Sequence, residues 1–230
     1  MSLQRVLLSW SSGKDSAWAL HTLRQQPDVE VVGLLTTFNE TNNRVAMHAV
    51  RQELVSAQAE AVGVSLWSVP LPFPCSNEEY EARMRVVIER ASREGVTHVA
   101  FGDLFLEDIR AYRERMMADT GIQPIFPIWC TLKDTKALAE EMIENNLRAV
   151  LTALDPKQLP PAFAGRFYDT QLLNELPETV DPCGENGEFH TFCFDGPIFR
   201  HPIPLRVGET VTRDGFVFTD LVPVIDNGEG

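Results

Sequence analysis

Residues 5–20 read RVLLSWSSGKDSAWAL, and this stretch decides the fold. A short apolar run ends at Trp10, a serine-rich turn follows it, and an apolar pattern with helical spacing starts at once. Strand, tight turn and helix in direct succession are typical of the first unit of an α/β protein. In a parallel sheet this first turn lies at the carboxyl edge of the strands, where ligands bind.

Strands and helices are predicted to alternate along the first part of the chain. Apolar runs rich in Val, Leu and Phe predict strands at residues 29–38, 64–69 and 96–101. Two apolar stripes between them predict helices, one made of Ala46, Val50, Leu54, Ala57 and Ala61 and the other of Tyr80, Met84, Val87 and Ala91. Ser76 and Glu79 form a capping box before the second stripe. This alternation predicts an α/β fold with a doubly wound parallel sheet, covered on both faces.

The pattern changes after about residue 130. A helix is predicted at residues 134–146 and a strand at 147–153, and short strands with turns follow from Gly187 onward. We therefore expect a first domain at residues 4–130 and a smaller C-terminal α+β domain at residues 131–225.

Two Asp-Gly pairs stand between predicted strands of this second part, Asp195-Gly196 and Asp214-Gly215. Such a pair favours a two-residue hairpin turn because both of its residues tolerate positive φ. We predict a hairpin at each pair.

Composition limits the class of partner. The chain carries 33 acidic and 20 basic side chains, a net charge of -13, which disfavours binding to a large nucleic acid through its phosphates. The apolar runs are too short to span a bilayer, and no stretch reads as a signal peptide. We therefore expect a cytoplasmic protein without a membrane partner. The four cysteines form no Cys-x-x-Cys pair and are predicted to be reduced thiols, not zinc ligands.

The turn at residues 11–16 has the composition of an anion site. Backbone N–H groups at a helix N-terminus attract negative charge. Ser11, Ser12 and Ser16 add hydroxyl donors, and Lys14 adds a positive charge beside flexible Gly13. This combination predicts a site for several phosphates on one ligand. The alternative is a capped turn that binds nothing, against which Lys14 argues, since a cation at a helix N-terminus needs an anion to offset it.

Two carboxylates are predicted to hold magnesium at this site. Asp15 would repel a phosphate unless a cation lay between them, so Mg²⁺ bridging the two is the economical interpretation; alternatively, Asp15 caps the helix. Gly102 and Asp103 follow the fourth predicted strand and should line the same edge of the sheet. There Asp103 would hold magnesium or orient a nucleophile, and an ordinary helix-starting turn is the alternative for this pair.

A second polar segment, residues 181–192, reads DPCGENGEFHTF. Acidic side chains and a histidine gather around two glycines, which is more than a hairpin turn requires. Glu188 and His190 share a face if the segment is a strand. With Glu185 they would bind a metal or ammonium, or act as a general base. A solvated acidic loop is the alternative.

These segments together carry a resemblance to a known family. A Walker A loop would require glycine where Leu8 stands; the loop at 11–16 instead resembles the Ser-Gly-Gly-x-Asp-Ser loop of PP-loop ATP pyrophosphatases. With Gly102-Asp103 and the late Gly-Glu-Asn-Gly-Glu-Phe-His-Thr segment, the chain resembles the diphthine-ammonia ligase family of HUP-like, adenine nucleotide alpha hydrolase-like proteins, over about residues 4–225. Its Met47-His48 and Gly102-Asp103 segments resemble bacterial members. Ser12 replaces the first loop glycine. If φ is positive at this position, serine destabilises the folded protein by about 1–2 kcal/mol relative to glycine.

The resemblance implies a nucleotide-binding PP-loop domain at residues 4–130, a substrate-binding domain at 131–225, and an AMP-forming ligase. Such an enzyme uses ATP and Mg²⁺ to adenylate a carboxylate, releases pyrophosphate and transfers ammonia to the acyl group. The acceptor, a protein side chain or a metabolite, stays open, and a homodimer is compatible with the sequence. The residues expected to bind ATP are Ser11, Ser12, Gly13, Lys14, Asp15, Ser16, Thr36, His48 and Gly102. Those expected to be catalytic are Lys14, Asp103, Glu185, Glu188 and His190, with Mg²⁺ on Asp15 and Asp103.

Two other functions fit parts of the sequence. A tRNA-modifying PP-loop enzyme would require a reactive cysteine pair and a basic surface, and the composition offers neither. A sensor module that binds ATP or AMP without catalysis is compatible with Ser12 in the loop but leaves the polar segment 181–192 without a role.

Overall fold

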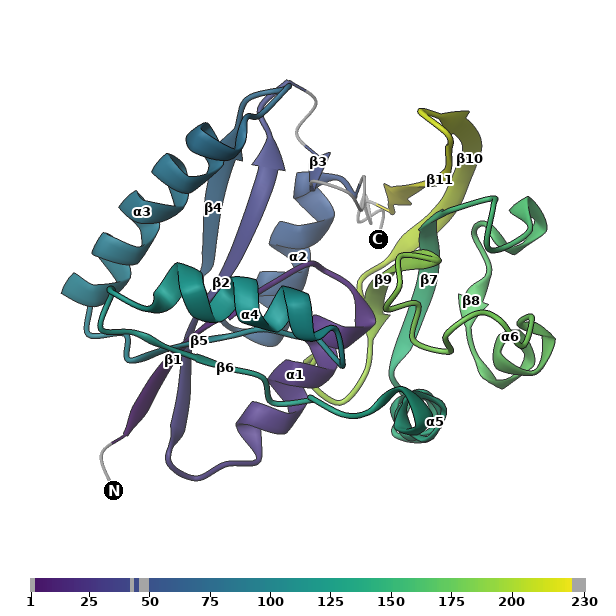
Figure 1. Cartoon of the computed structure of the whole chain (residues 1–230). Coiled ribbons are helices and arrows are strands. Elements are labelled where there is room, and N and C mark those ends of the chain that lie inside the picture. Colours follow the sequence, from purple (N-terminus) through teal and green to yellow (C-terminus); the bar gives the residue numbers. More distant parts are fainter. Residues whose placement is uncertain (1–2, 42–43, 46–49, 225–230) are drawn as a thin grey trace, which may run out of the picture.

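The first part of the chain forms a mostly parallel sheet (Figure 1). The computed structural model describes residues 3–41, 44–45 and 50–224. Its parallel strands lie in the order β4-β2-β1-β5-β6, and the short strand β3 pairs antiparallel with the end of β2. The bounds are β1 Gln4–Ser9, β2 Val29–Asn39, β3 Arg44–Val45, β4 Leu66–Leu71, β5 His98–Ala100 and β6 Gln123–Ile125. The winding runs outward from β1 in both directions, which confirms the predicted doubly wound sheet.

Helices cover both faces of this sheet. They are α1 (Lys14–Arg24), α2 (Gln52–Val62), α3 (Asn77–Arg93) and α4 (Glu107–Met117). Side chains of β1 alternate between the two faces. Val6 and Leu8 pack into one core with α1 and α2, whereas Leu7 packs into a separate core with α3 and α4.

The helix predictions are confirmed with one shift. The hydroxyl of Ser76 accepts a hydrogen bond from the Glu79 N–H at 3.2 Å, so α3 begins with the predicted cap. The preceding helix, α2, begins only at Gln52, so Val50 lies before it, and Ala46 lies outside the described residues.

The second part of the chain forms an antiparallel sheet with short helices, as predicted for an α+β unit. Strand β7 is central: β9 occupies one of its edges, and β8 and β11 pair along the other. The strands are β7 Arg148–Leu154, β8 Phe167–Tyr168, β9 Phe189–Asp195, β10 Leu205–Arg213 and β11 Phe216–Pro223. The helices are α5 Thr135–Glu144, α6 Thr170–Glu175 and the 3₁₀ turns Leu132–Asp134 and Pro161–Phe163.

One of the two hairpin predictions is wrong. Asp214 and Gly215 have φ of 52° and 84° and join β10 to β11 in a tight hairpin. Asp195 instead ends β9, which pairs with β7 and not with the strand that follows it. A Cβ at Gly196 would lie 3.1 Å from the Leu147 Cα. Gly196 is therefore needed because two backbone segments pass close to each other at this position. The sequence pattern does not distinguish this requirement from that of a turn.

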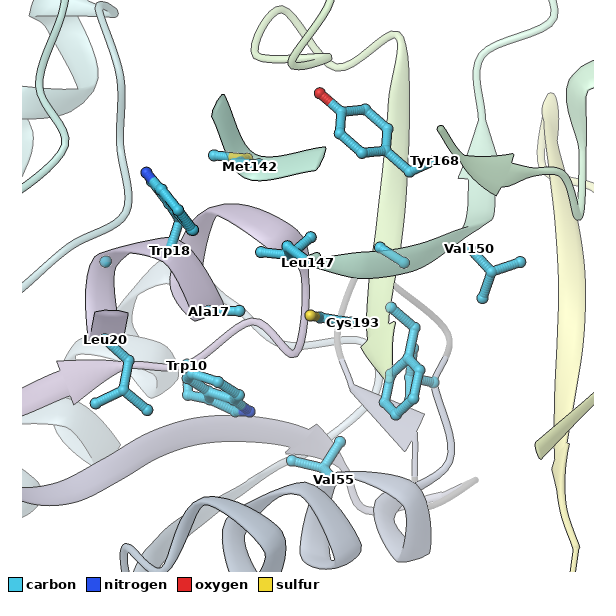
Figure 2. Close-up of a cluster of buried hydrophobic side chains, with 14 of the residues drawn as sticks. Trp10, Ala17, Trp18, Leu20, Val55, Met142, Leu147, Val150, Tyr168 and Cys193 are labelled. Carbon is cyan, nitrogen blue, oxygen red and sulfur yellow. The ribbon is translucent and has the colours of Figure 1, made fainter. Parts of the chain in front are cut away.

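The two sheets share one apolar core. Figure 2 shows Trp10, Ala17 and Val55 from the first part in the same cluster as Val150 and Cys193 from the second. Helix α1 lies between the parallel sheet and β9 (Figure 1). The division at residues 130 and 131 stays a prediction; the chain leaves the first sheet at Ile125 and enters the second at Arg148. No helix in the described part of the chain is long and apolar enough to cross a membrane.

Candidate active site

The loops after β1 and β5 meet at the carboxyl edge of the parallel sheet. These strands are neighbours at the point where the winding changes direction, which is the usual ligand crevice of such sheets. A Cβ at Gly102 would lie 3.1 Å from the Asp15 carbonyl carbon and from the Ser16 nitrogen. Glycine at this position therefore lets the loop after β5 approach the first turn of α1.

Ser12 has the left-handed backbone that its replacement of a loop glycine put in question. Its φ is 70° and its side chain is fully buried, with no hydrogen-bond partner for the hydroxyl. The Ser12 carbonyl accepts hydrogen bonds from Cys193 N at 2.9 Å and from Gln58 Nε2 at 3.0 Å. Its role is therefore in the shape of the loop, and its side chain does not line the cavity described below.

The remaining loop serines bond within the loop. Ser11 Oγ lies 3.2 Å from Ser16 Oγ and accepts from Gly13 N at 3.3 Å, and Ser16 Oγ donates to the Gly13 carbonyl at 3.0 Å. Both hydroxyls line the cavity.

Lys14 is the buried cation of the site. The side chain is 1% exposed, and Nζ donates to the two Asp15 carboxylate oxygens at 2.8 and 2.9 Å and to the Cys183 carbonyl. The rings of Tyr168 and Phe189 lie 5.4 and 5.6 Å from Nζ, within cation–π range. Burial lowers the pKa of Lys14, but Asp15 and the other groups around it more than offset this and raise it overall. Lys14 therefore stays charged.

A cavity of about 290 Å³ brings most of the predicted site residues together. Its wall comes from the loop after β1, the loop after β5 and the segment 183–191 of the second part. The predicted residues that line it are Ser11, Gly13, Lys14, Asp15, Ser16, Gly102, Asp103, Glu185 and His190. Two loops of one sheet and one segment of the other thus meet around a single space.

Glu185 and His190 also line this wall and have displaced pKa values. Burial and the charge of Asp15 raise the pKa of Glu185 to about 8. The Leu104 N–H donates to Glu185 Oε1 at 2.7 Å, and this hydrogen bond lowers the pKa by a smaller amount. Burial and the positive charge of Lys14 lower the pKa of His190 to about 4. At neutral pH His190 is therefore neutral, and Glu185 is mostly protonated. Carboxyl groups with pKa values near 7 are suited to proton transfer.

Of the predicted site residues that the structure describes, Glu188 and Thr36, besides Ser12, do not line this cavity. Glu188 is 1% exposed and does not line the cavity, because its carboxylate turns into its own loop and accepts from Asp181 N and Asn186 Nδ2, both at 3.0 Å. Thr36 lines a neighbouring cavity. His48 lies outside the described residues.

The neighbouring cavity, about 360 Å³, opens between the sheet and helices α3 and α4. It shares Ser9, Ser11, Phe101 and Arg113 with the first cavity, so the two are adjacent. Its other walls are largely apolar and aromatic, with Trp10, Leu35, Val45, Leu71, Tyr80, Met84, Ile88, Val99, Tyr112, Met116 and Met117. A pocket of this kind accepts a flat apolar ring system.

Sequence reasoning missed several residues of the site. Tyr168 and Thr191 contact Lys14 from the second part of the chain, and Asp181 binds the Glu185 N–H at 2.9 Å. The positions of Thr191 and Asp181 inside the polar segment 181–192 were a signal. Tyr168 gave none, since it stands alone in a two-residue strand.

Family models match both parts of the chain. The diphthamide synthase N-terminal domain matches residues 4–124, and the diphthamide synthase C-terminal domain matches residues 134–219. The chain belongs to the diphthamide synthase family. The predicted resemblance is therefore confirmed at the level of the family.

Curated relatives agree with this membership. A diphthine–ammonia ligase from Danio rerio is 29% identical over 207 residues, which cover 78% of this chain and 80% of the relative. One from Bos taurus is 27% identical over 164 residues, covering 69% and 61%, and one from Homo sapiens is 26% identical over 152 residues, covering 64% and 56%. The matches thus span less than two thirds of the bovine and human proteins.

Among solved structures, the U34-tRNA thiolase NcsA from Methanococcus maripaludis is similar with a TM-score of 0.38 and 17% identity, over 62% of this chain and 57% of that chain. We draw nothing from a likeness of this size.

Proposed function

We propose that the protein is an AMP-forming amide ligase that uses ATP to adenylate a carboxylate and then transfers ammonia to it. The observation that carries the proposal is the single cavity lined both by the serine-rich loop, with Lys14, and by the polar segment around Glu185 and His190. A ligase of this type needs the α-phosphate, the carboxylate and the nitrogen in one place. The names of the curated relatives support the same reaction class.

ATP would span the two adjacent cavities. The adenine ring suits the apolar cavity beside Thr36 and Tyr112, and the triphosphate suits the loop N–H groups at the start of α1. Arg113 lines both cavities and lies 3.4 Å from Asp103 through Nε. It would add positive charge where the two parts of the nucleotide meet.

Mg²⁺ fits the donors that this cavity offers. Asp15 and Asp103 both line it and supply carboxylate oxygens, which Mg²⁺ prefers. Among the described residues no group of three or more protein ligands could hold a metal, so the ion would complete its shell with phosphate oxygens and water, as is usual for this metal. When bound, it would neutralise phosphate charge.

The protein's own residues would act in two steps. In the first, a carboxylate oxygen of the acceptor attacks the α-phosphorus and pyrophosphate leaves. Lys14, which donates to Asp15 in the structure, would instead donate to the phosphate oxygens on which negative charge develops. In the second, the nitrogen of ammonia attacks the acyl carbon, AMP leaves and one proton is released. Neutral His190 and the ionised fraction of Glu185 both line the cavity and would be available to accept that proton.

The experiment follows the products of ATP. Protein, ATP, Mg²⁺, ammonium and candidate carboxylates, including a diphthine-bearing protein, are mixed, and the nucleotides are separated. We expect AMP and pyrophosphate, and release of ADP and orthophosphate would contradict the proposal. Lys14→Met should abolish turnover, while Lys157→Met, which removes an exposed lysine, should not.

Two controls accompany this experiment. Lys14→Met leaves the Asp15 carboxylate without its partner, so the melting temperature of this variant is measured to test whether any loss of turnover comes from unfolding. Tight ATP binding without turnover on any carboxylate would favour the sensor alternative.

A further inference from the structure

Two buried carboxylate side chains of the segment 181–192 do not line the cavity. Asp181 is 4% exposed and Glu188 is 1% exposed. They are in contact, because the Asp181 N–H donates to Glu188 Oε1 at 3.0 Å. Neither residue belongs to the cavity lining, which in this segment is made of Cys183, Gly184, Glu185 and Gly187, followed by residues 189–191.

Each carboxylate keeps one oxygen without a partner. Asp181 Oδ2 accepts from Glu185 N at 2.9 Å and Glu188 Oε1 from Asn186 Nδ2 at 3.0 Å, but Asp181 Oδ1 and Glu188 Oε2 are buried and unpaired. Nor does either residue form an ion pair with any residue that the structure describes. Buried carboxylates without a compensating positive charge are strongly unfavourable.

The nearby lysine does not fill this need. Lys14 Nζ is directed to both oxygens of Asp15 and to the Cys183 carbonyl, and its charge is matched by Asp15. Arg113, the other cation of the cavity, faces Asp103. The Asp181–Glu188 pair therefore has acceptors for a small cation that the described side chains do not supply.

We propose that Asp181 and Glu188 bind the ammonium ion whose nitrogen is transferred in the reaction; this inference rests on the proposed function. On leaving the pair the ion gives one proton to a carboxylate and enters the cavity as ammonia, and a second proton is released when ammonia displaces AMP. Ammonium donates hydrogen bonds to separate oxygens, which suits two carboxylates that each offer one. A divalent metal would want more ligands, and no group of three exists among the described residues. Asp181 also holds the backbone of Glu185, so the ion would lie directly behind a residue of the reaction cavity.

This placement separates the nitrogen from the nucleotide until the acyl group is formed. The ion would be divided from the cavity only by the segment 183–187, in which Gly184 and Gly187 have φ of 70° and 83°. Water is excluded from the two free oxygens, each of which has almost no exposed surface. A nitrogen source stored here would compete well with water for the acyl group.

The test uses ammonium chloride and rubidium chloride with the full chain. A ligand that binds only the folded state raises the melting temperature. At equal ionic strength we expect saturating ammonium chloride to raise it by about 3 °C or more over sodium chloride. Asp181→Asn and Glu188→Gln should lose this difference, and Glu178→Gln, which removes an exposed carboxylate close in sequence, should keep it. An equal shift in the wild type and in both carboxylate variants would overturn the proposal.

A crystallographic measurement locates the ion without depending on a variant that folds. Rubidium resembles ammonium in size and scatters anomalously, so a crystal of the wild type in rubidium chloride should show an anomalous peak between Asp181 and Glu188 that ammonium chloride displaces. The absence of an anomalous peak at these carboxylates would overturn the proposal. The outcome is separate from that of the proposed function: binding of ammonium without release of pyrophosphate would retain the site and reject the ligase, and the reverse result would reject only the site.

Discussion

The hydroxyl of Thr191 on β9 accepts a hydrogen bond from the backbone N–H of Lys14 at 3.1 Å, so a side chain of the second sheet caps the first turn of α1. The helix has no side-chain cap of its own, because Gly13 stands at its N-cap position. A Cβ at Gly13 would lie 3.1 Å from the Thr191 carbonyl oxygen. The phosphate loop and the polar segment 181–192 are thus held to each other, which fixes the distance between the two halves of the proposed reaction.

Thr191→Val should therefore weaken ATP binding. The change leaves the buried Lys14 N–H without an acceptor, which costs about 1–3 kcal/mol. We expect the dissociation constant of Mg-ATP to rise about tenfold for each 1.4 kcal/mol of this cost that is lost from the binding free energy. Titration calorimetry measures it. Thr212→Val, on the exposed strand β10, is the matched control and should bind like the wild type. Unchanged binding by Thr191→Val would mean that the cap does not position the loop.

Ser12→Gly should stabilise the protein. A serine at φ 70° is strained by about 1–2 kcal/mol, and its buried hydroxyl has no partner. Glycine removes both penalties. It also makes the unfolded chain more flexible, which lowers the free energy of unfolding by about 0.4–1 kcal/mol. We expect the free energy of unfolding in urea to rise by about 1 kcal/mol. Asp214→Gly, at φ 52° in an exposed turn, should gain less because Asp tolerates this conformation; a loss of stability in Ser12→Gly would refute the strain argument.

The residues that were predicted correctly are those governed by local pattern. The doubly wound sheet, the cap at Ser76 and the grouping of Lys14 with Asp15 and Asp103 in one cavity follow from periodicity and from the rule for carboxyl edges. The contact of Lys14 with Thr191 joins positions 177 residues apart, and no periodicity reports on it. Glu188 turned away from His190 because its loop, which holds Gly187 at φ 83°, leaves the strand geometry that a period of two assumes.

Two glycines of the polar segment give a matched pair of stability measurements. Both have positive φ, but a Cβ at Gly184 would lie 2.8 Å from the Phe189 carbonyl oxygen, whereas a Cβ at Gly187 meets nothing within 4 Å. Gly187→Ala should therefore lower the free energy of unfolding by about 1–2 kcal/mol, the strain alone. Gly184→Ala adds an overlap with backbone and should lower it by about 3 kcal/mol. Equal losses in urea denaturation would show that the loop shifts freely to make room.

The raised pKa of Glu185 predicts how stability changes with pH. The group is protonated in the folded state up to about pH 8, but in the unfolded chain it ionises near its ordinary value of about 4.3. Between these values the folded state binds more protons than the unfolded state, so the free energy of unfolding falls as pH rises and levels off above about pH 8. Glu185→Gln should remove this contribution.

The comparison with Glu185→Gln separates this contribution from that of His190. His190, whose pKa is lowered to about 4, acts in the opposite direction: the unfolded state binds its proton up to about pH 6.5, so stability rises with pH between these values. Its effect fades between about pH 6.5 and about pH 7.5, as the unfolded histidine loses its proton. Up to about pH 8, the difference between the wild type and Glu185→Gln is the contribution of Glu185. Urea denaturation at a series of pH values in this range should show a falling free energy of unfolding in the wild type and in the exposed control Glu178→Gln, and a flatter profile in Glu185→Gln. Parallel profiles in all three proteins would mean that the pKa of Glu185 in the folded state is close to its value in the unfolded chain.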